Sequence, residues 1–374
     1  MRHANITLTR FLSGDAGHLM STRPPTALQA VLHEVAASVK TIAAALARGT
    51  LGDSAHADSV AGGAALAYSA RRRKPGETAS RNGSANDASR PEYQLAFDPL
   101  NCTWSADVNG SAGSIFSVTR VQSQGSDAAN GDSVGDANAG SYGQPDGKSG
   151  VERHGEADGA PCLLPGREQA AAGYTIYGPA TMLIFTLGEG THGFTLDGET
   201  EEFVLTHPSI RIPEDTGEIA VDASNERFWE PPVRRYVHEC REGRAGCRER
   251  DFSLRWSDAV VPEVHRILMR GGLFLMPRDY RTRSAMRGRL SAVYDASPLG
   301  FLVEQAGGMA TTGRERVLHA APRAFHERMP LILGSANEVA RIGRYHREHD
   351  LGIDAPFTSP LFRERSLFLP EVSV

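Results

Sequence analysis

The sequence predicts an α/β fold, an α+β layered sandwich in which helices cover β-sheets, and three observations lead to this class. Short apolar stretches of strand length alternate along the chain with longer segments whose apolar residues recur at helical spacing. The chain has 374 residues, of which 40% are hydrophobic, so it can bury more than one core. Charged residues make up 23% of it, which is ordinary for a globular protein.

Composition and charge argue against several classes of protein. The formal net charge of −5 gives no electrostatic reason to expect a nucleic-acid partner. No apolar stretch reaches the roughly 18 residues that span a bilayer, and Met1 to Leu12 lack the apolar core of a signal peptide. We therefore expect no membrane association. None of the 4 cysteines belongs to a Cys-x-x-Cys pair, which favours free thiols in a reducing cytoplasm.

The N-terminal part of the chain predicts one long helix and two neighbouring strands. Apolar residues recur at helical spacing from Ala27 to Arg48, and Gly49 can end the helix. Glu92 to Phe97 has the pattern of a strand that stops at Pro99, because proline has no N–H to continue a ladder. Gly113 to Arg120 is predicted to be a second strand.

Regular elements return after residue 163. We expect strands at 180–187, 193–197, 202–206, 273–276 and 331–333. We expect helices at 232–240, 260–270, 298–306 and 337–348. This alternation of strands and helices is the pattern of a layered α/β arrangement.

Two segments have no such pattern. Residues 51–90 accumulate Gly, Ser, Ala, Asn and Asp, and contain the basic run Arg71 to Lys74, which we interpret as a solvated surface. Residues 122–160 have almost no large apolar side chains, so they cannot bury enough surface to offset the entropy lost on ordering. We expect a disordered insertion there, in a connection between two strands.

The stretch from Phe97 to Asp107 has features of a ligand-binding loop. Asp98 lies where a strand gives way to a loop, a position that can direct a carboxylate into a crevice. The small residues from Gly110 to Ser114 would let the backbone approach a ligand closely. An Asp before a Pro is also a common turn former, so this stretch alone does not identify a site.

Motifs beyond this stretch resemble those of class 1 fructose-1,6-bisphosphatases of the bacterial type. They occur in the family's order, and they include Gly166–Tyr174, Thr191–Phe194, Asn225–Pro232, Val264–Leu268 and Thr312–Arg316. The resemblance implies a sugar-phosphatase fold with two α/β halves, residues 1–200 with the metal and phosphate loop and residues 201–374 with the sugar-phosphate site. It also implies a cytoplasmic homotetramer that hydrolyses the 1-phosphate of a small-molecule sugar bisphosphate, fructose 1,6-bisphosphate, in gluconeogenesis.

The resemblance also implies a Mg²⁺ site, for which Mn²⁺ is an alternative, formed by Asp98, the carbonyl of Leu100, Asp295 and Glu77. Such a site suits Mg²⁺ because this ion prefers hard oxygen ligands. Asp98 and Asn101 are the candidate catalytic residues. Asn101 stands where the family has a second aspartate, so we expect weaker cation binding here. Glu77 has no Ser-Glu-Glu motif around it and could instead be a solvated loop residue.

Five residues are assigned to the sugar phosphates by the same resemblance: Thr103, Asn225, Arg255, Trp256 and Arg289. Arg255 matches an arginine that reaches the distal phosphate from a neighbouring subunit. Trp256 replaces a tyrosine, and Arg289 replaces a lysine and keeps its charge. Two alternatives remain open, because Asn225 could cap a turn and Arg255 could form a surface ion pair.

Departures from the family pattern concentrate at the metal and phosphate positions. Cys102 replaces a glycine, Trp104 a serine, Met276 a tyrosine and Ser291 an arginine. Two functional hypotheses fit this pattern. The first is an active phosphoric monoester hydrolase with a weakened metal site. The second is a catalytically impaired homologue with a regulatory or sugar-phosphate-binding role.

Overall fold

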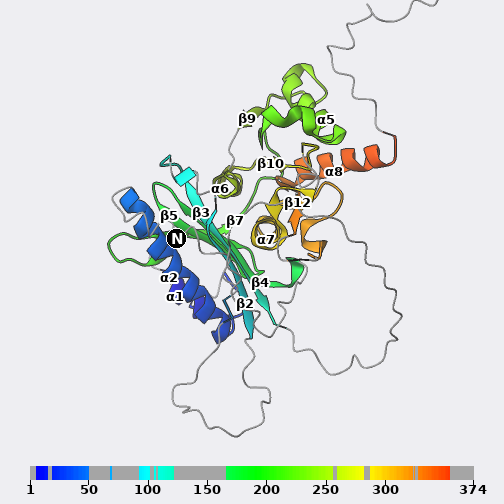
Figure 1. Cartoon of the computed structure of the whole chain (residues 1–374). Coiled ribbons are helices and arrows are strands. Elements are labelled where there is room, and N and C mark those ends of the chain that lie inside the picture. Colours follow the sequence, from blue (N-terminus) through cyan, green and yellow to red (C-terminus); the bar gives the residue numbers. More distant parts are fainter. Residues whose placement is uncertain are drawn as a thin grey trace, which may run out of the picture.

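Layers of helix, sheet, helix, sheet and helix make up the part of the chain that the structure describes (Figure 1). The structure is a computed structural model, and it describes residues 6–15, 19–49, 68–69, 92–101, 105–106, 108–121, 166–255, 259–281, 287–322, 324 and 327–353. Three large hydrophobic clusters fill the spaces between the layers, and one of them lies on both sides of the middle helices. This arrangement confirms the predicted α/β sandwich.

The first sheet is a seven-stranded antiparallel meander whose strands lie in chain order. Its strands are β1 (Tyr68–Ser69), β2 (Tyr93–Asn101), β3 (Ala112–Arg120), β4 (Gln169–Tyr177), β5 (Thr181–Thr186), β6 (Thr191–Leu196) and β7 (Phe203–Ile210). The predicted strand 113–120 does pair with the strand before it, as β3 with β2. The sheet continues to Ile210, so β7 lies beyond the expected division of the chain at residue 200.

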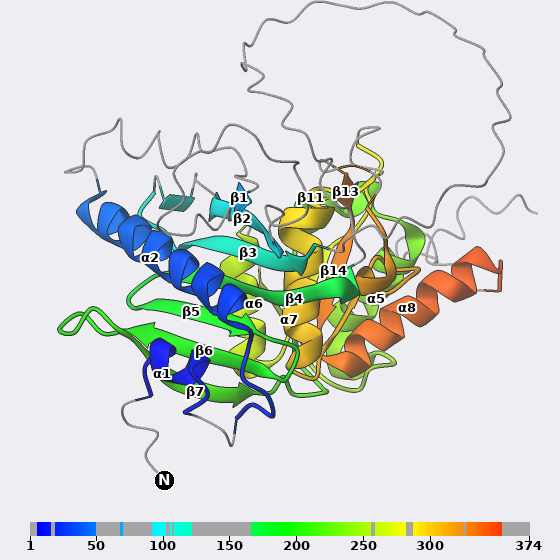
Figure 2. The ribbon, with the colours of Figure 1, turned by 90° about the horizontal axis from the view of Figure 1, so that it is seen from below.

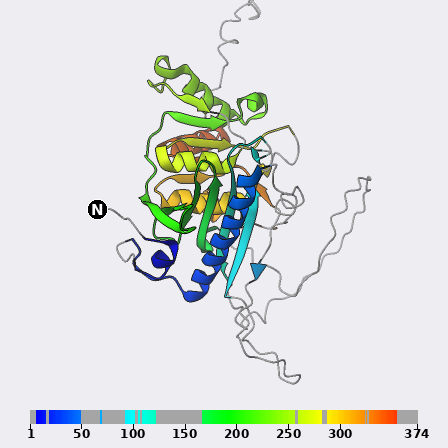
Figure 3. The same ribbon diagram turned by 90° about the vertical axis from the view of Figure 1, so that its left-hand side faces the viewer.

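Helix α2 (Thr26–Arg48) covers the outer face of this sheet, and the short helix α1 (Leu8–Leu12) adds to the same core (Figure 3). The expectation that no apolar stretch is long enough to span a bilayer was wrong. By length and composition, α2 is long and apolar enough to cross a membrane. Its buried stripe nevertheless packs on the sheet, and consists of Leu28, Val31, Leu32, Val35, Ala36, Val39 and Ile42. We therefore interpret α2 as a core helix.

Helices α6 (Val260–Arg270) and α7 (Ser297–Gln305) lie between the two sheets (Figure 2). Their apolar faces share one core with the inward residues of both sheets. In the described part of the chain, α6 and α7 are the only layer between the two sheets. Gly113 allows the close approach of β3 to α6. A Cβ at this position would come 2.4 Å from Val261 Cγ1, so a larger residue would push the helix away from the sheet.

The second sheet has five strands in the order β12-β14-β10-β8-β9. They are β8 (Glu218–Val221), β9 (Ser253–Arg255), β10 (Leu273–Met276), β12 (Met309–Thr311) and β14 (Leu331–Gly334). Helices α5 (Pro231–Glu242) and α8 (Ala336–Asp350) cover its far face. A separate two-stranded sheet joins β11 (Leu290–Ser291) to β13 (Arg328–Met329).

Short helices complete the described elements. They are the 3-10 helices η2 (Gly166–Glu168), η3 (Ala223–Phe228), η4 (Gly243–Ala245) and η7 (Val317–His319), and the π-helix η6 (Ala292–Ala296). The helix 260–270 and the strand 273–276 have the predicted bounds. The insertion expected at 122–160 lies outside the described residues.

Candidate metal and phosphate site

Strand β2 does not stop before Pro99, as the sequence suggested, but continues to Asn101. Asp98 lies opposite Ile115 and Asn101 lies opposite Gly113, so β2 advances by one residue more than β3 over this stretch. This is a β-bulge, and a bulge tolerates proline because the ladder is interrupted there. The extra residue brings Asp98 and Asn101 to the same face, where Asn101 Nδ2 donates to Asp98 Oδ2 at 3.1 Å.

Asp295 joins this pair from a distant part of the chain. It lies in the π-helix η6, where it is 8% exposed. Its Oδ1 accepts a hydrogen bond from Asn101 Nδ2 at 3.2 Å, and its Oδ2 accepts one from the backbone N–H of Ser291 at 2.8 Å. The Ser291 hydroxyl in turn accepts from the Tyr294 N–H at 3.2 Å and so caps the π-helix. The fold therefore brings together three of the residues that the sequence singled out.

Burial destabilises the charged forms of both carboxyl groups. It raises the pKa of Asp295 to about 7, with a further contribution from the charge of Asp98 and opposition from the Ser291 N–H. Burial also raises the pKa of Asp98, although hydrogen bonds from Asn101 and from the Leu100 N–H oppose the rise. A cation between the two carboxylates would relieve this cost, because it would neutralise both charges where water is excluded.

The oxygen atoms at this place suit a hard divalent cation. Asp98 and Asp295 supply carboxylates, while the carbonyl of Leu100 remains a predicted ligand. Among the described residues no three His, Cys, Asp or Glu side chains gather in a metal-binding group. Two carboxylates are nevertheless enough for Mg²⁺, which usually keeps several waters in its coordination shell. Glu77, the fourth predicted ligand, lies outside the described residues.

A pocket in the second half of the chain contains two of the predicted substrate residues. Asn225 and Arg289 line it together with Met276, Asp222 and Asp279. The pocket is small and partly open to solvent, and its empty space of about 370 Å³ includes that open solvent. The sequence had not identified the two aspartates.

Asn225 is 6% exposed and lies within the 3-10 helix η3. It does not cap this turn, because Asp222 is the N-cap and accepts from the Ser224 N–H at 3.2 Å. Asn225 Nδ2 donates to the other carboxylate oxygen of Asp222. This contact fixes the amide of Asn225 at the wall of the pocket.

The pocket and the carboxylate cluster are connected through β11. Arg289 lines the pocket, and Ser291, two residues later, donates its N–H to Asp295. Arg328 NH1 donates to the carbonyl of Arg289 at 2.6 Å and so holds this segment in place. Arg289 in the wall of the pocket and Ser291 beside Asp295 are therefore two residues apart in the chain.

Arg255 does not line this pocket. It lies on the edge strand β9, with 46% of its side chain exposed, and its guanidinium forms two hydrogen bonds of 3.0 Å with Glu218. The structure thus has the alternative that was left open, a surface ion pair. Thr103 and Trp256 lie outside the described residues, as do Cys102 and Trp104.

Two residues that support the site, Ser114 and Tyr177, were missed in the sequence. Ser114 Oγ donates to the Pro99 carbonyl in the bulge at 2.6 Å and lies 2.6 Å from the Tyr177 hydroxyl. In the sequence, Ser114 stands out only as one of the small residues near the loop. The available signal was a serine inside the predicted strand 113–120, since a hydroxyl buried in a sheet needs a partner.

Two family models match most of the chain. Residues 80–208 match the model described as "Fructose-1-6-bisphosphatase, N-terminal domain", and residues 212–347 match "Fructose-1-6-bisphosphatase, C-terminal domain". A curated protein of Paraburkholderia phymatum, "Fructose-1,6-bisphosphatase class 1 3", is 84% identical over 374 residues, the full length of both chains. One of Methylacidiphilum infernorum, "Fructose-1,6-bisphosphatase class 1", is 49% identical over 279 residues, covering 75% of this chain and 70% of its own.

Solved structures of fructose-1,6-bisphosphatase from Leishmania major have the same fold. The holo form superposes with a TM-score of 0.68 at 24% identity, covering 91% of this chain and 98% of that one. The T-state form gives a TM-score of 0.66 at 25% identity, with the same coverage.

Proposed function

The chain belongs to the class 1 fructose-1,6-bisphosphatase family, and we propose that it hydrolyses the 1-phosphate of fructose 1,6-bisphosphate. Water attacks the phosphorus, the bond to the C1 oxygen breaks, and fructose 6-phosphate and inorganic phosphate are released. The observation that carries this proposal is the meeting of Asp98, Asn101 and Asp295, to which the pocket lined by Asn225 and Arg289 is connected through the segment from Arg289 to Ser291. The reaction belongs to carbohydrate metabolism, and we place it in gluconeogenesis.

Enzymes of this family are in general metal-dependent, and we propose Mg²⁺ as the ion, with Mn²⁺ able to replace it. Asp98, Asp295, the carbonyl of Leu100 and Glu77 would hold it. When bound, such an ion acidifies a water molecule and neutralises the oxygens of the phosphoryl group. The raised pKa of Asp295 supports the assignment, because a buried carboxyl group gains most from a nearby cation.

The substrate residues divide into two groups in this proposal. Arg289 and Asn225 would bind the sugar phosphate inside the pocket, where Arg289 supplies a positive charge and Asn225 a fixed amide. Thr103 would contact the phosphate beside the metal ligands, and Trp256 would pack near the sugar. Binding at both ends of the substrate orients the 1-phosphate toward the carboxylates.

We further propose a cytoplasmic homotetramer. Arg255 supports an assembly, because it lies half-exposed on an edge strand and outside the pocket of its own subunit. It could reach the distal phosphate only in a neighbouring subunit. The free thiols of Cys240 and Cys247 are consistent with a reducing compartment. Light scattering of the purified protein tests the mass, and cell fractionation tests the location.

Phosphate release from fructose 1,6-bisphosphate, titrated with Mg²⁺ and with Mn²⁺, tests the enzyme assignment. We expect turnover that saturates with metal, and a loss of at least about 100-fold in Asp98→Asn, because that variant lacks a metal-binding charge. Asp215→Asn, an exposed aspartate, is the matched control and should keep full activity. A folded protein that releases no phosphate at any metal concentration would favour the catalytically impaired homologue. The 84% identity to a curated bisphosphatase favours the active enzyme.

A further inference from the structure

Strand β13 supports residues 288–291, the segment that carries Arg289 to the wall of the pocket. The segment and β13 pair in antiparallel fashion, with Ser291 opposite Arg328. At the start of the segment, Gly288 has a φ of +100°, and a Cβ there would come 1.9 Å from the carbonyl carbon of Met329. Only glycine permits this approach. The segment therefore lies directly against the β13 backbone.

Arg328 adds a side-chain contact to this support. It is the exposed first residue of β13, and its NH1 donates to the carbonyl oxygen of Arg289 at 2.6 Å. A hydrogen bond from a charged donor is stronger than one between neutral groups. On the other side of the segment, the Ala292 N–H donates to the Glu327 carbonyl at 2.8 Å. The backbone around Arg289 is thus fixed at both ends and also at the carbonyl of Arg289 itself.

The two acidic residues in the wall of the pocket already have partners. Asp222 accepts a hydrogen bond from Asn225, and Asp279 accepts one from Arg281, whose NH2 lies 2.8 Å from Asp279 Oδ2. These carboxylates therefore leave Arg289 available for a ligand. Since its side chain starts from a backbone that β13 holds, the support from β13 decides where its guanidinium can reach.

We propose that Arg328 is a positioning residue for the pocket. By holding the Arg289 carbonyl, it fixes the point from which the Arg289 side chain reaches a bound sugar phosphate. Arg328 acts through Arg289 and does not itself contact the ligand. The inference rests on the proposed function, because it takes a sugar phosphate as the ligand of this pocket.

Binding of fructose 6-phosphate, the product of the proposed reaction, tests this role without turnover. Isothermal titration calorimetry of the full-length protein gives the Kd. We expect Arg328→Met to raise the Kd about 10-fold, because a displaced binding group loses much of its interaction. Arg328→Lys keeps a charged donor, so its Kd should rise by less than about 3-fold. Arg347→Met, at an exposed position on α8, is the control and should keep the wild-type Kd.

A double-mutant cycle separates positioning from a direct contact. If Arg328 acts through Arg289, Arg328→Met should not change the Kd further in an Arg289→Ala background. Equal weakening in both backgrounds would mean that Arg328 binds the phosphate itself, and would overturn the proposal. An unchanged Kd in Arg328→Met would also overturn it, as would a wild type that does not bind fructose 6-phosphate.

Thermal melting shows whether each variant is folded. If Arg328→Met does not fold, Arg328→Gln takes its place in the cycle, because glutamine is polar but too short to replace the arginine contact. A wild type that binds fructose 6-phosphate but releases no phosphate from fructose 1,6-bisphosphate would refute the enzymatic function alone. The test of Arg328 would still stand, because it measures binding.

Discussion

The Ser114 hydroxyl lies 2.6 Å from the carbonyl oxygen of Pro99 and donates a hydrogen bond to it. The Tyr177 hydroxyl, also 2.6 Å from Ser114 Oγ, must then donate to Ser114, because the single hydrogen of Ser114 is already used. Ser114 is fully buried and Tyr177 nearly so. The two hydroxyls thus connect strands β3 and β4 to the bulge that positions Asp98.

Ser114→Ala should loosen this bulge. The Pro99 carbonyl and the Tyr177 hydroxyl would lose their buried partner, which costs about 1–3 kcal/mol of stability. A displaced Asp98 would also lower kcat, by about 10-fold or more, because small shifts of a metal ligand are costly. Denaturant unfolding and steady-state kinetics measure the two effects. Ser117→Ala on the same strand is the control, and equal kcat values in the two variants would contradict this role for Ser114.

Arg289→Ala should weaken substrate binding more than it slows the chemical step. The variant removes a positive charge from the wall of the pocket. Loss of a hydrogen bond to a charged phosphate costs about 1.5–3 kcal/mol, so KM for fructose 1,6-bisphosphate should rise about 10- to 100-fold. Initial rates at saturating metal would show the change.

Arg287→Ala is the matched control for that prediction. Arg287 is an exposed arginine two residues away and does not line the pocket. Its KM should stay at the wild-type value. If both variants raised KM equally, the effect would come from overall charge and not from a contact of Arg289 with substrate.

His265 should make the fold sensitive to mild acid. Burial lowers the pKa of His265 to about 4, helped by the charge of His207, and its Nδ1 lies 2.9 Å from the Tyr174 hydroxyl. In the unfolded chain the pKa returns to its ordinary value near 6.5, so the unfolded state binds more protons between these two values. Stability is therefore complete above pH 6.5 and is lost as the pH falls toward 4.

His265→Gln removes this titration and can keep a hydrogen bond to Tyr174. Between pH 7 and pH 4 the wild type should lose up to about 3 kcal/mol more stability than the variant does. Unfolding curves recorded at several pH values give this difference. Parallel losses in the two proteins would show that other groups control the acid response.

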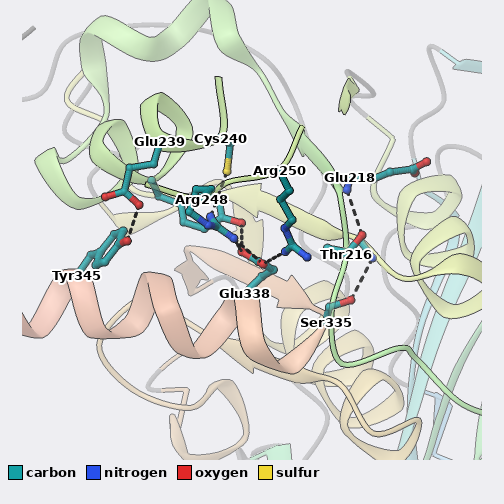
Figure 4. Close-up of polar contacts among 11 residues, drawn as sticks. Thr216, Glu218, Glu239, Cys240, Arg248, Arg250, Ser335, Glu338 and Tyr345 are labelled. Atoms are coloured by element: carbon teal, nitrogen blue, oxygen red, sulfur yellow. Dashed lines mark hydrogen bonds and ion pairs between the residues drawn. The ribbon is translucent and has the colours of Figure 1, made fainter. Parts of the chain in front are cut away.

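Glu338→Gln should destabilise the C-terminal half strongly. Figure 4 shows Glu338 at the start of α8 with Arg248 and Arg250 directed toward it. Arg248 NH2 lies 2.6 and 2.7 Å from the two carboxylate oxygens, and both side chains are 2% exposed. The variant would leave Arg248 buried without its counter-charge, which costs about 3–5 kcal/mol.

An exposed ion pair provides the comparison for Glu338. Arg244 and Asp251 are 80% and 68% exposed and lie 3.0 Å apart. Water already solvates both charges, so Asp251→Asn should cost less than about 1 kcal/mol. Urea unfolding of both variants measures the contrast. A similar loss in each would mean that burial does not control the strength of the Arg248–Glu338 pair.

The elements that could be predicted from the sequence have a clear local pattern. Helix 260–270 and strand 273–276 were found with their bounds because their apolar spacing is regular and glycines separate them. Strand β4 was missed although it has 9 residues, and β8 and β9 were missed because they are short and their order in the sheet depends on non-local pairing. The end of β2 was also misplaced, because a bulge admits Pro99 where a regular ladder would not.

The sequence by itself determined the family, the layered fold and the identity of Asp98, Asn101 and Asp295 as candidates, because ordered motifs carry that information. Only the tertiary structure decided how these three meet. Asn101 and Asp295 are 194 residues apart in the chain, and no local pattern can specify a hydrogen bond between them. That contact depends on a bulge in one sheet and on a π-helix packed against it, and both form only when the layers assemble.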